Sequence, residues 1–210
     1  MILYIDGCDE EALEMAQKYN VGITTNPSIV LRDRKGYKLL DILKEILKYD
    51  IKEVFLQIGE DEALLEKLKD FPKERIVIKL SWYEKAFKVH DLSKKLGFRT
   101  CATAVYEERQ LVTAIMKGVD YIAVYYDRMK RKGISPSERI SKFKKILERF
   151  SPGTKILAAS LKSLDQALDA LLSGADGITL PKALFKETID VSSYVMDEIK
   201  KFNEDLRAIL

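Results

Sequence analysis

Short apolar runs alternate with longer amphipathic stretches from one end of the chain to the other. Most of the short runs are rich in Val and Ile, a composition typical of parallel strands that are buried on both faces. We predict eight strands from these runs: Ile2–Ile5, Val21–Thr24, Val54–Ile58, Ile76–Leu80, Thr100–Ala104, Tyr121–Tyr125, Ile156–Ser160 and Gly177–Leu180.

The segments between the runs have apolar residues at helical spacing. Asp9 is a good N-cap for a helix over Glu10–Lys18. Further helical stripes fall within residues 39–47, 64–68, 86–96, 111–116, 140–150 and 164–172. Eight strands that alternate with helices predict a parallel sheet closed into a (β/α)8 barrel. The competing architecture is an open doubly wound sheet, which usually carries a glycine-rich phosphate loop after its first strand, and Asp6-Gly7-Cys8-Asp9 is not such a loop.

The length of the chain limits the loops of such a barrel. At 210 residues the chain suits one domain over 1–210, and it is shorter than the roughly 250 residues typical of the fold. We therefore expect short loops and a site built from residues at the strand ends. An amphipathic segment at about residues 191–208 follows the eighth strand, and we predict an additional C-terminal helix that needs a surface to pack on.

Composition excludes several classes of function. The net charge of +3 is spread along the chain without a basic block, which argues against nucleic-acid binding. No run approaches the roughly 18 apolar residues of a membrane span, and no signal peptide is evident. Cys8 and Cys101 lack disulfide or metal-ligand spacing. We therefore expect a cytoplasmic protein with no metal and no membrane or nucleic-acid partner.

Seven of the eight predicted strands end in a polar group. In a barrel of this kind the carboxyl ends of the strands form one face, where the chemistry takes place. These polar groups therefore describe a pocket on that face: Asp6, Thr24-Thr25-Asn26, Gln57, Lys79, Thr103, Tyr125 and Ser160.

Lys79 is the most informative of these residues, because it interrupts the apolar run Ile76–Leu80. A buried ammonium group is costly unless it is paired or loses its proton, and a neutral amine can attack a carbonyl. Taken alone, Lys79 could equally be a lysine at a strand mouth with its head in water. The polar ends of the other strands favour the nucleophilic amine.

The segment Gly22-Ile-Thr-Thr-Asn-Pro-Ser28 resembles the signature of the small transaldolases and fructose-6-phosphate aldolases. Other segments follow in the order and spacing of that family, and the similarity covers essentially the whole chain: Tyr4–Asp6, Ile76–Lys79, Thr103–Tyr106, Tyr125–Arg128 and Leu157–Ser160. The resemblance implies a Schiff-base aldolase on a (β/α)8 barrel.

The resemblance also implies a role for each polar strand end. Lys79 would form the Schiff base with a ketose, and no cofactor is expected, because the imine does the work of a metal ion. Asp6 and Asn26 would hydrogen-bond the sugar hydroxyls next to Thr24, which we also place among the substrate-binding residues. The remaining residues would hold a catalytic water (Gln57, Thr103 and Tyr125) or the substrate phosphate (Arg128 and Ser160).

The expected reaction is cleavage or formation of the C3–C4 bond of a ketose or ketose phosphate such as fructose 6-phosphate. Gln57 and Tyr125 match the fructose-6-phosphate aldolases, whereas the small transaldolases usually carry glutamate and phenylalanine there. Two alternatives remain: a transaldolase that transfers the dihydroxyacetone unit, and a silent sugar-phosphate binding protein. The resemblance further implies a homo-oligomer, a pentamer or decamer, with the C-terminal helix at the interface.

Several positions depart from the family pattern or leave a choice open. After Lys79 the family usually continues with Val or Ile and then Pro, whereas this chain has Leu80-Ser81-Trp82. We expect Trp82 either to narrow the mouth of the site or to pack under the helix at 86–96. The negative charge of Asp127 would oppose phosphate if it pointed inward. If the sixth strand ends one residue later, Tyr126 would be the inward phenol in place of Tyr125.

Overall fold

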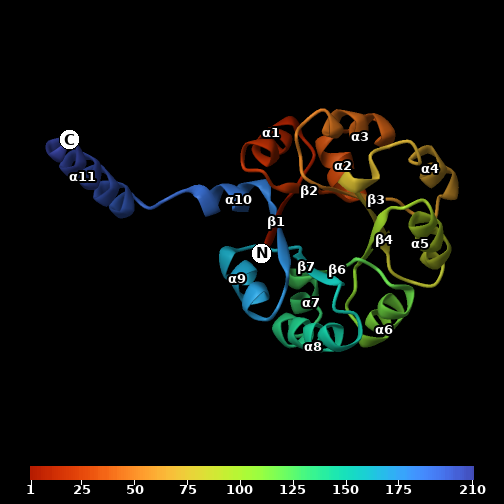
Figure 1. Ribbon diagram of the computed structural model, residues 1–210. Helices are drawn as coiled ribbons and strands as arrows, with labels where there is room; N and C mark the ends of the chain where they lie inside the picture. Colours follow the sequence, from red (N-terminus) through yellow and green to blue (C-terminus); the bar gives the residue numbers. More distant parts are fainter.

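The computed structural model describes residues 1–210 and shows eight parallel strands closed into a barrel in chain order (Figure 1). Strand β8 pairs with β1 from Ile2↔Gly177 to Asp6↔Pro181 and closes the ring. This confirms the (β/α)8 barrel. The strands are β1 (Ile2–Asp6), β2 (Gly22–Thr24), β3 (Val54–Gln57), β4 (Ile76–Ser81), β5 (Arg99–Thr103), β6 (Tyr121–Tyr125), β7 (Lys155–Ala159) and β8 (Gly177–Pro181).

Helices surround the barrel in the order expected from the sequence. The expected ones are α1 (Glu10–Lys18), α3 (Leu39–Leu47), α4 (Glu62–Lys67), α5 (Ala86–Lys95), α6 (Glu108–Lys117), α8 (Pro136–Phe150), α9 (Leu164–Leu172) and the C-terminal α11 (Ser193–Ile209). Three short helices were not anticipated: α2 (Pro27–Asp33), α7 (Tyr126–Arg131) and α10 (Lys182–Ile189). Each begins within three residues of a strand end, so all three lie close to the face expected to carry the site.

The strands separate two cores. The larger core fills the space between the strands and the helices and includes Ile5, Ile78 and Phe143. The smaller core fills the barrel itself and includes Phe55 and Val77. Because successive side chains of a strand point to opposite faces, every second residue belongs to the inner core. This alternation decides which polar residues face the barrel interior.

A paired charge closes the barrel at the amino ends of the strands. Glu53 accepts hydrogen bonds from the hydroxyls of Tyr4 and Tyr121 and forms an ion pair with Arg99. Gly22 is required beside it, because a Cβ there would lie 2.4 Å from the Tyr4 ring. Both carboxylate oxygens of Glu53 therefore have hydrogen-bonding partners. We interpret this cluster as a stabilising element that closes the barrel at the amino ends of the strands.

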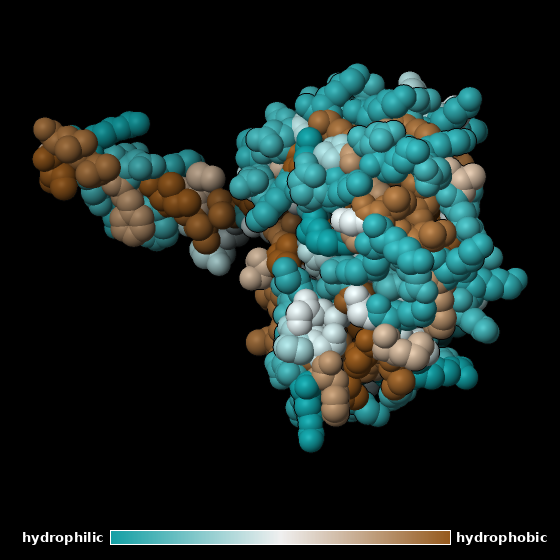
Figure 2. All heavy atoms as spheres, turned by 45° about the vertical axis from the view of Figure 1, so that its right-hand side comes forward, coloured by the Kyte–Doolittle hydropathy of each residue, from teal (hydrophilic) through white to brown (hydrophobic).

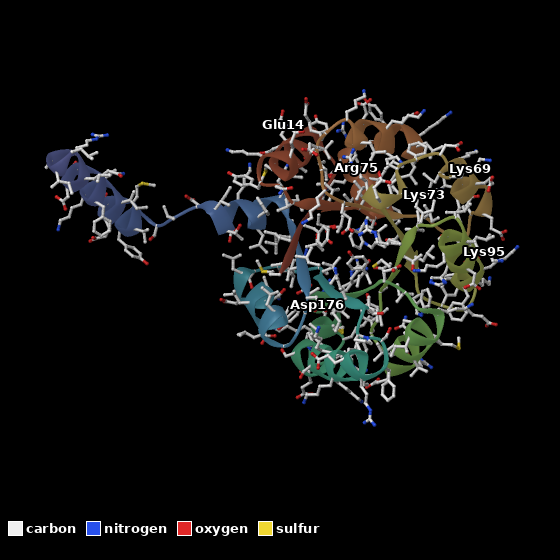
Figure 3. All side chains as sticks on the ribbon, viewed as in Figure 1. Glu14, Lys69, Lys73, Arg75, Lys95 and Asp176 are labelled. Atoms are coloured by element: carbon white, nitrogen blue, oxygen red, sulfur yellow. The ribbon has the colours of Figure 1, made fainter.

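Side chains at the amino ends also tie the loops to the strands. Arg75, labelled in Figure 3, donates hydrogen bonds to the carbonyls of Leu47 and Tyr49 and so fixes the loop after α3. Asp176, also labelled there, accepts from the backbone N–H of Ile156 at 2.8 Å at the start of β7. These bonds hold the strand register that positions the opposite face.

Helix α11 projects away from the barrel (Figure 1), and apolar residues run along it in the space-filling view (Figure 2). Tyr194 and Phe202 are 73% and 65% exposed, and α11 contains no buried residue. An apolar helix face in water is unfavourable. Even so, no helix of the structure is both long enough and apolar enough to cross a bilayer.

Candidate active site

The alternation of strand residues carries polar groups into the barrel at its carboxyl end. Lys79 on β4 is in register with Gln57 on β3, and Ser81 is in register with Thr103 on β5. Lys79 and Ser81 lie two residues apart on one strand and therefore share the inner face. Gln57 and Thr103, two of the strand ends expected in the site, therefore lie on the strands that flank Lys79.

Lys79 is 3% exposed. Its Nζ donates a hydrogen bond to the carbonyl oxygen of Thr25 at 3.0 Å. The side chain of Thr25 points elsewhere and donates to the carbonyl of Phe55. With one N–H engaged, the neutral form of this amine would have one further N–H and a lone pair free, and the lone pair is the group that attacks a carbonyl.

Asp6 lies in a chain of hydroxyl groups beside the lysine. Thr24 Oγ1 is 2.8 Å from Asp6 Oδ1 and 2.6 Å from Thr179 Oγ1. Burial raises the pKa of the Asp6 carboxyl above its usual value, while the positive charge of Lys79 and the hydrogen bond from Thr24 oppose this rise. The site therefore holds an acid close to the amine at a desolvation cost.

Thr179 was missed in the sequence reasoning. It is 2% exposed and lies at the middle of β8, facing the barrel interior with Thr24. The signal was the same as for Lys79: a polar residue inside the apolar run Gly177–Leu180. With Thr179, each of the eight strands contributes a polar group, from the middle of the strand in β8 and from the carboxyl end in the others.

Tyr125 is the inward phenol of β6. Its OH accepts a hydrogen bond from Thr103 Oγ1 at 2.9 Å. Tyr126 points to the outer layer and donates to Asp169 on α9 at 2.6 Å. The choice left open between the two tyrosines is therefore resolved in favour of Tyr125.

Gln57 makes one hydrogen bond and leaves one atom unpaired. Its Nε2 donates to Ser81 Oγ at 3.2 Å, while its Oε1 is buried without a partner. Buried acceptors without donors are rare in native proteins and call for an explanation. Here the unpaired acceptor belongs to the residue in register with Lys79.

Arg128 lies on α7, directly after β6. Its side chain is exposed, and its guanidinium stacks on the ring of Tyr125 at 4.7 Å. Asp127 pairs instead with Arg131 at 2.9 Å along the same helix, so its charge is engaged away from Arg128. An exposed arginine over the inward phenol is placed to receive an anionic group of a ligand.

Ser160 and Asn26 take part in the backbone geometry of the same face. Ser160 has a left-handed backbone with φ of 60°, and its carbonyl accepts from the N–H of Asp127. This conformation costs of order 1–3 kcal/mol for a residue other than glycine.

Asn26 caps α2, since its Oδ1 accepts from the N–H of Ile29 at 3.0 Å. The side-chain oxygen of Asn26 is thus already engaged, whereas no protein group accepts a hydrogen bond from its side-chain NH₂.

Trp82 corrects one expectation. The prediction that it narrows the mouth of the site is wrong, because Trp82 is one residue out of phase with Ser81 and points outward. Its indole is 3% exposed, donates to Thr113 Oγ1 and packs on Phe87 and His90. The alternative, packing under α5, is confirmed, and His90 is a helix-packing residue.

No group of three or more His, Cys, Asp or Glu side chains is arranged to hold a metal ion.

A family model described as transaldolase/fructose-6-phosphate aldolase matches residues 57–210, well over half of the chain. The match includes Gln57, Lys79 and Tyr125 and begins after Asp6 and the Gly22–Ser28 segment. On the strength of this match, supported by the closed barrel and its buried lysine, the chain belongs to the transaldolase/fructose-6-phosphate aldolase family of aldolase-type enzymes.

Proposed function

We propose that this protein is a class I aldolase that cleaves or forms the C3–C4 bond of a ketose or ketose phosphate such as fructose 6-phosphate. The observation that carries the proposal is the buried Nζ of Lys79, held only by the Thr25 carbonyl among the polar strand ends. In this mechanism the neutral amine attacks the ketose carbonyl, water leaves, and a protonated imine forms. The polar side chains of Asp6, Gln57 and Tyr125, which the neighbouring strands place in the same barrel, support this proposal.

Bond cleavage then follows from the electron demand of the imine. The hydroxyl proton at C4 is removed, the C3–C4 electrons move into the imine, and the aldehyde departs. The enamine left on Lys79 takes a proton at C3, and water releases dihydroxyacetone. We assign both proton transfers to Tyr125, acting through a water between the Thr103–Tyr125 pair and Gln57.

The proposed substrate contacts follow the same geometry. Asp6 and Thr24 would hydrogen-bond the sugar hydroxyls, and Asn26 would contribute its free amide N–H groups. Arg128 and Ser160 would hold a phosphate at the mouth, since a guanidinium matches phosphate geometry and this fold binds phosphate near its last strands.

Tyr125 also distinguishes a lyase from a transferase. A phenol can deliver a proton to the enamine, so the three-carbon unit is released without an acceptor. In a transaldolase the enamine must survive until an acceptor aldehyde arrives. The Thr103–Tyr125 hydrogen bond favours release, because it fixes the phenol in the barrel interior.

The test is release of dihydroxyacetone from fructose 6-phosphate with no acceptor present. The wild-type protein should release it, and Tyr125→Phe should slow release about 100-fold, the scale of general acid–base catalysis, while an imine still forms. The matched control is Tyr126→Phe, which removes an outward phenol. If the protein exchanges the three-carbon unit between sugar phosphates far faster than it frees dihydroxyacetone, the transaldolase alternative holds. Binding without turnover or imine formation would identify a sugar-phosphate binding protein.

A further inference from the structure

Ser81 stands where the family pattern has a proline, and its hydroxyl takes part in the site. It is the last residue of β4, shares the inner face with Lys79 and is in register with Thr103. Gln57 Nε2 donates to its Oγ at 3.2 Å. A proline at this position has no side-chain acceptor for this hydrogen bond. The contact between Gln57 and Ser81 therefore distinguishes this chain from the family pattern.

The hydrogen bond fixes the direction of the Gln57 amide. Nitrogen and oxygen lie on opposite sides of a planar amide, so holding Nε2 at Ser81 turns Oε1 away from it. Oε1 is buried and has no donor. An acceptor left in this state is costly, and the cost is removed when a donor arrives, such as a water molecule or a sugar hydroxyl.

Two hydrogen-bonded pairs flank the lysine on consecutive strands. Gln57 and Ser81 join β3 to β4, while Thr103 and Tyr125 join β5 to β6. The register that pairs Ser81 with Thr103 brings the two pairs together. A water molecule between the two pairs could hydrogen-bond to both of them. It would donate to the unpaired Oε1 of Gln57 on one side and contact the phenol of Tyr125 on the other.

We propose that Ser81 is a positioning residue that orients the Gln57 amide so that its oxygen holds the proton-transfer water beside Lys79. This inference rests on the proposed imine chemistry and adds a residue to it. Ser81 acts through Gln57, so its removal should slow protonation of the enamine without preventing imine formation.

Deuterium exchange isolates that step. Dihydroxyacetone alone in D₂O forms the imine, loses a carbon-bound proton to give the enamine, and takes up deuterium on return. NMR then reports the exchange rate, and borohydride reduction followed by intact mass reports imine formation on the same samples.

Ser81→Ala should slow deuterium uptake about two- to tenfold, the effect of one net hydrogen bond, at unchanged borohydride trapping and nearly unchanged KM. Ser81→Thr retains a hydroxyl and should restore uptake. The matched control is Ser141→Ala on the outer helix α8. In a Gln57→Met background, Ser81→Ala should cause no further loss, because the amide through which it acts is absent.

Each other outcome decides against a specific part of the account. Unchanged uptake in Ser81→Ala, or equal losses of uptake and trapping, would overturn the positioning role and leave the aldolase proposal standing. A further loss in the Gln57→Met background would show that Ser81 does not act through Gln57. No adduct and no uptake in the wild-type protein would reject the imine chemistry itself, and the role of Ser81 with it.

Discussion

At Asp6 a half-buried carboxylate lies close to the lysine on which the chemistry is proposed to take place. Burial is the largest influence on this group and raises the pKa of Asp6 above 3.8 despite the nearby charge of Lys79. Because the pKa of the Asp6 carboxyl is higher in the folded than in the unfolded protein, folding favours the protonated carboxyl. Its contribution to stability is fully present below the unfolded-state pKa and is lost as the pH rises through the folded-state pKa. The ionised form therefore lowers stability at neutral pH.

Asp6→Asn should consequently be more stable than the wild-type protein at pH 7, and the difference should shrink as the pH falls toward 3.8. Imine formation should decrease in the same variant. Thermal unfolding across this pH range measures the first effect, with Asp197→Asn on the exposed α11 as the control. A destabilised variant at pH 7 would show that the attraction between the charges of Asp6 and Lys79 outweighs the desolvation of the carboxylate.

Arg128 is expected to select phosphorylated substrates. A charge-assisted hydrogen bond contributes about 1.5–3 kcal/mol, so Arg128→Ala should lower kcat/KM for fructose 6-phosphate roughly ten- to a hundredfold. Deuterium exchange into dihydroxyacetone should be nearly intact, since that ligand has no phosphate. Lys130→Ala, which removes an exposed lysine of the same helix, is the control for charge. Equal losses on both ligands would assign Arg128 a structural role, consistent with its stacking on Tyr125.

At the scale of the element, the period of two along a strand decides which side chains reach the site. Sequence patterns located all eight strands, and the polar interruptions at Lys79, Thr103 and Tyr125 fall on the inner face. Polar groups at strand ends do not include Thr179, because this residue lies at the middle of β8. Trp82 follows Lys79 by only three residues, yet it belongs to the outer core, because neighbouring side chains of a strand point to opposite faces.

The short helices could not be predicted by the same reasoning. Helices α2 and α7 span only seven and six residues, too few to display an apolar stripe. Asn26 and Pro27 carry a helix-start signal, an N-cap followed by proline, but the helix that follows is too short for its apolar pattern to support that signal. The hydrogen bond between Gln57 and Ser81 was likewise beyond sequence reasoning, because it depends on the register of β3 against β4.

Trp82 gives an element-scale prediction about stability. The indole fills the space between β4, α5 and α6, so Trp82→Val should leave a cavity and cost about 2–4 kcal/mol. The substrate profile should not change. Chemical denaturation measures the loss, and Tyr83→Val, at a half-exposed neighbour, should change stability little. Broader aldehyde acceptance with unchanged stability would contradict the placement of Trp82 in the outer core.

For the whole molecule, α11 is the part of the chain without a partner. Its apolar residues Ile199, Phe202 and Leu206 are 40–65% exposed, and the helix lies apart from its own barrel. From the resemblance to the family we expect this helix at a subunit interface. We therefore predict that α11 packs on a neighbouring copy and that the protein is a homo-oligomer.

Light scattering at low concentration should give a mass several times the 24.1 kDa of one chain. Phe202→Asp should shift the protein toward smaller species, because it places a charge in the apolar face. Glu204→Lys, on the opposite side of the helix, should leave the assembly intact. A wild-type mass close to that of one chain would disprove the packing of α11 on a second copy.

The imine on Lys79 is the central claim of the account, and borohydride trapping tests it most directly. The protein is reduced in the presence of dihydroxyacetone, and the adduct is located by peptide mapping. We predict a single adduct, on the peptide that contains Lys79, and its loss in Lys79→Met. An adduct on any other lysine would contradict the assignment of the site, and the absence of an adduct with dihydroxyacetone and with fructose 6-phosphate would contradict the aldolase mechanism.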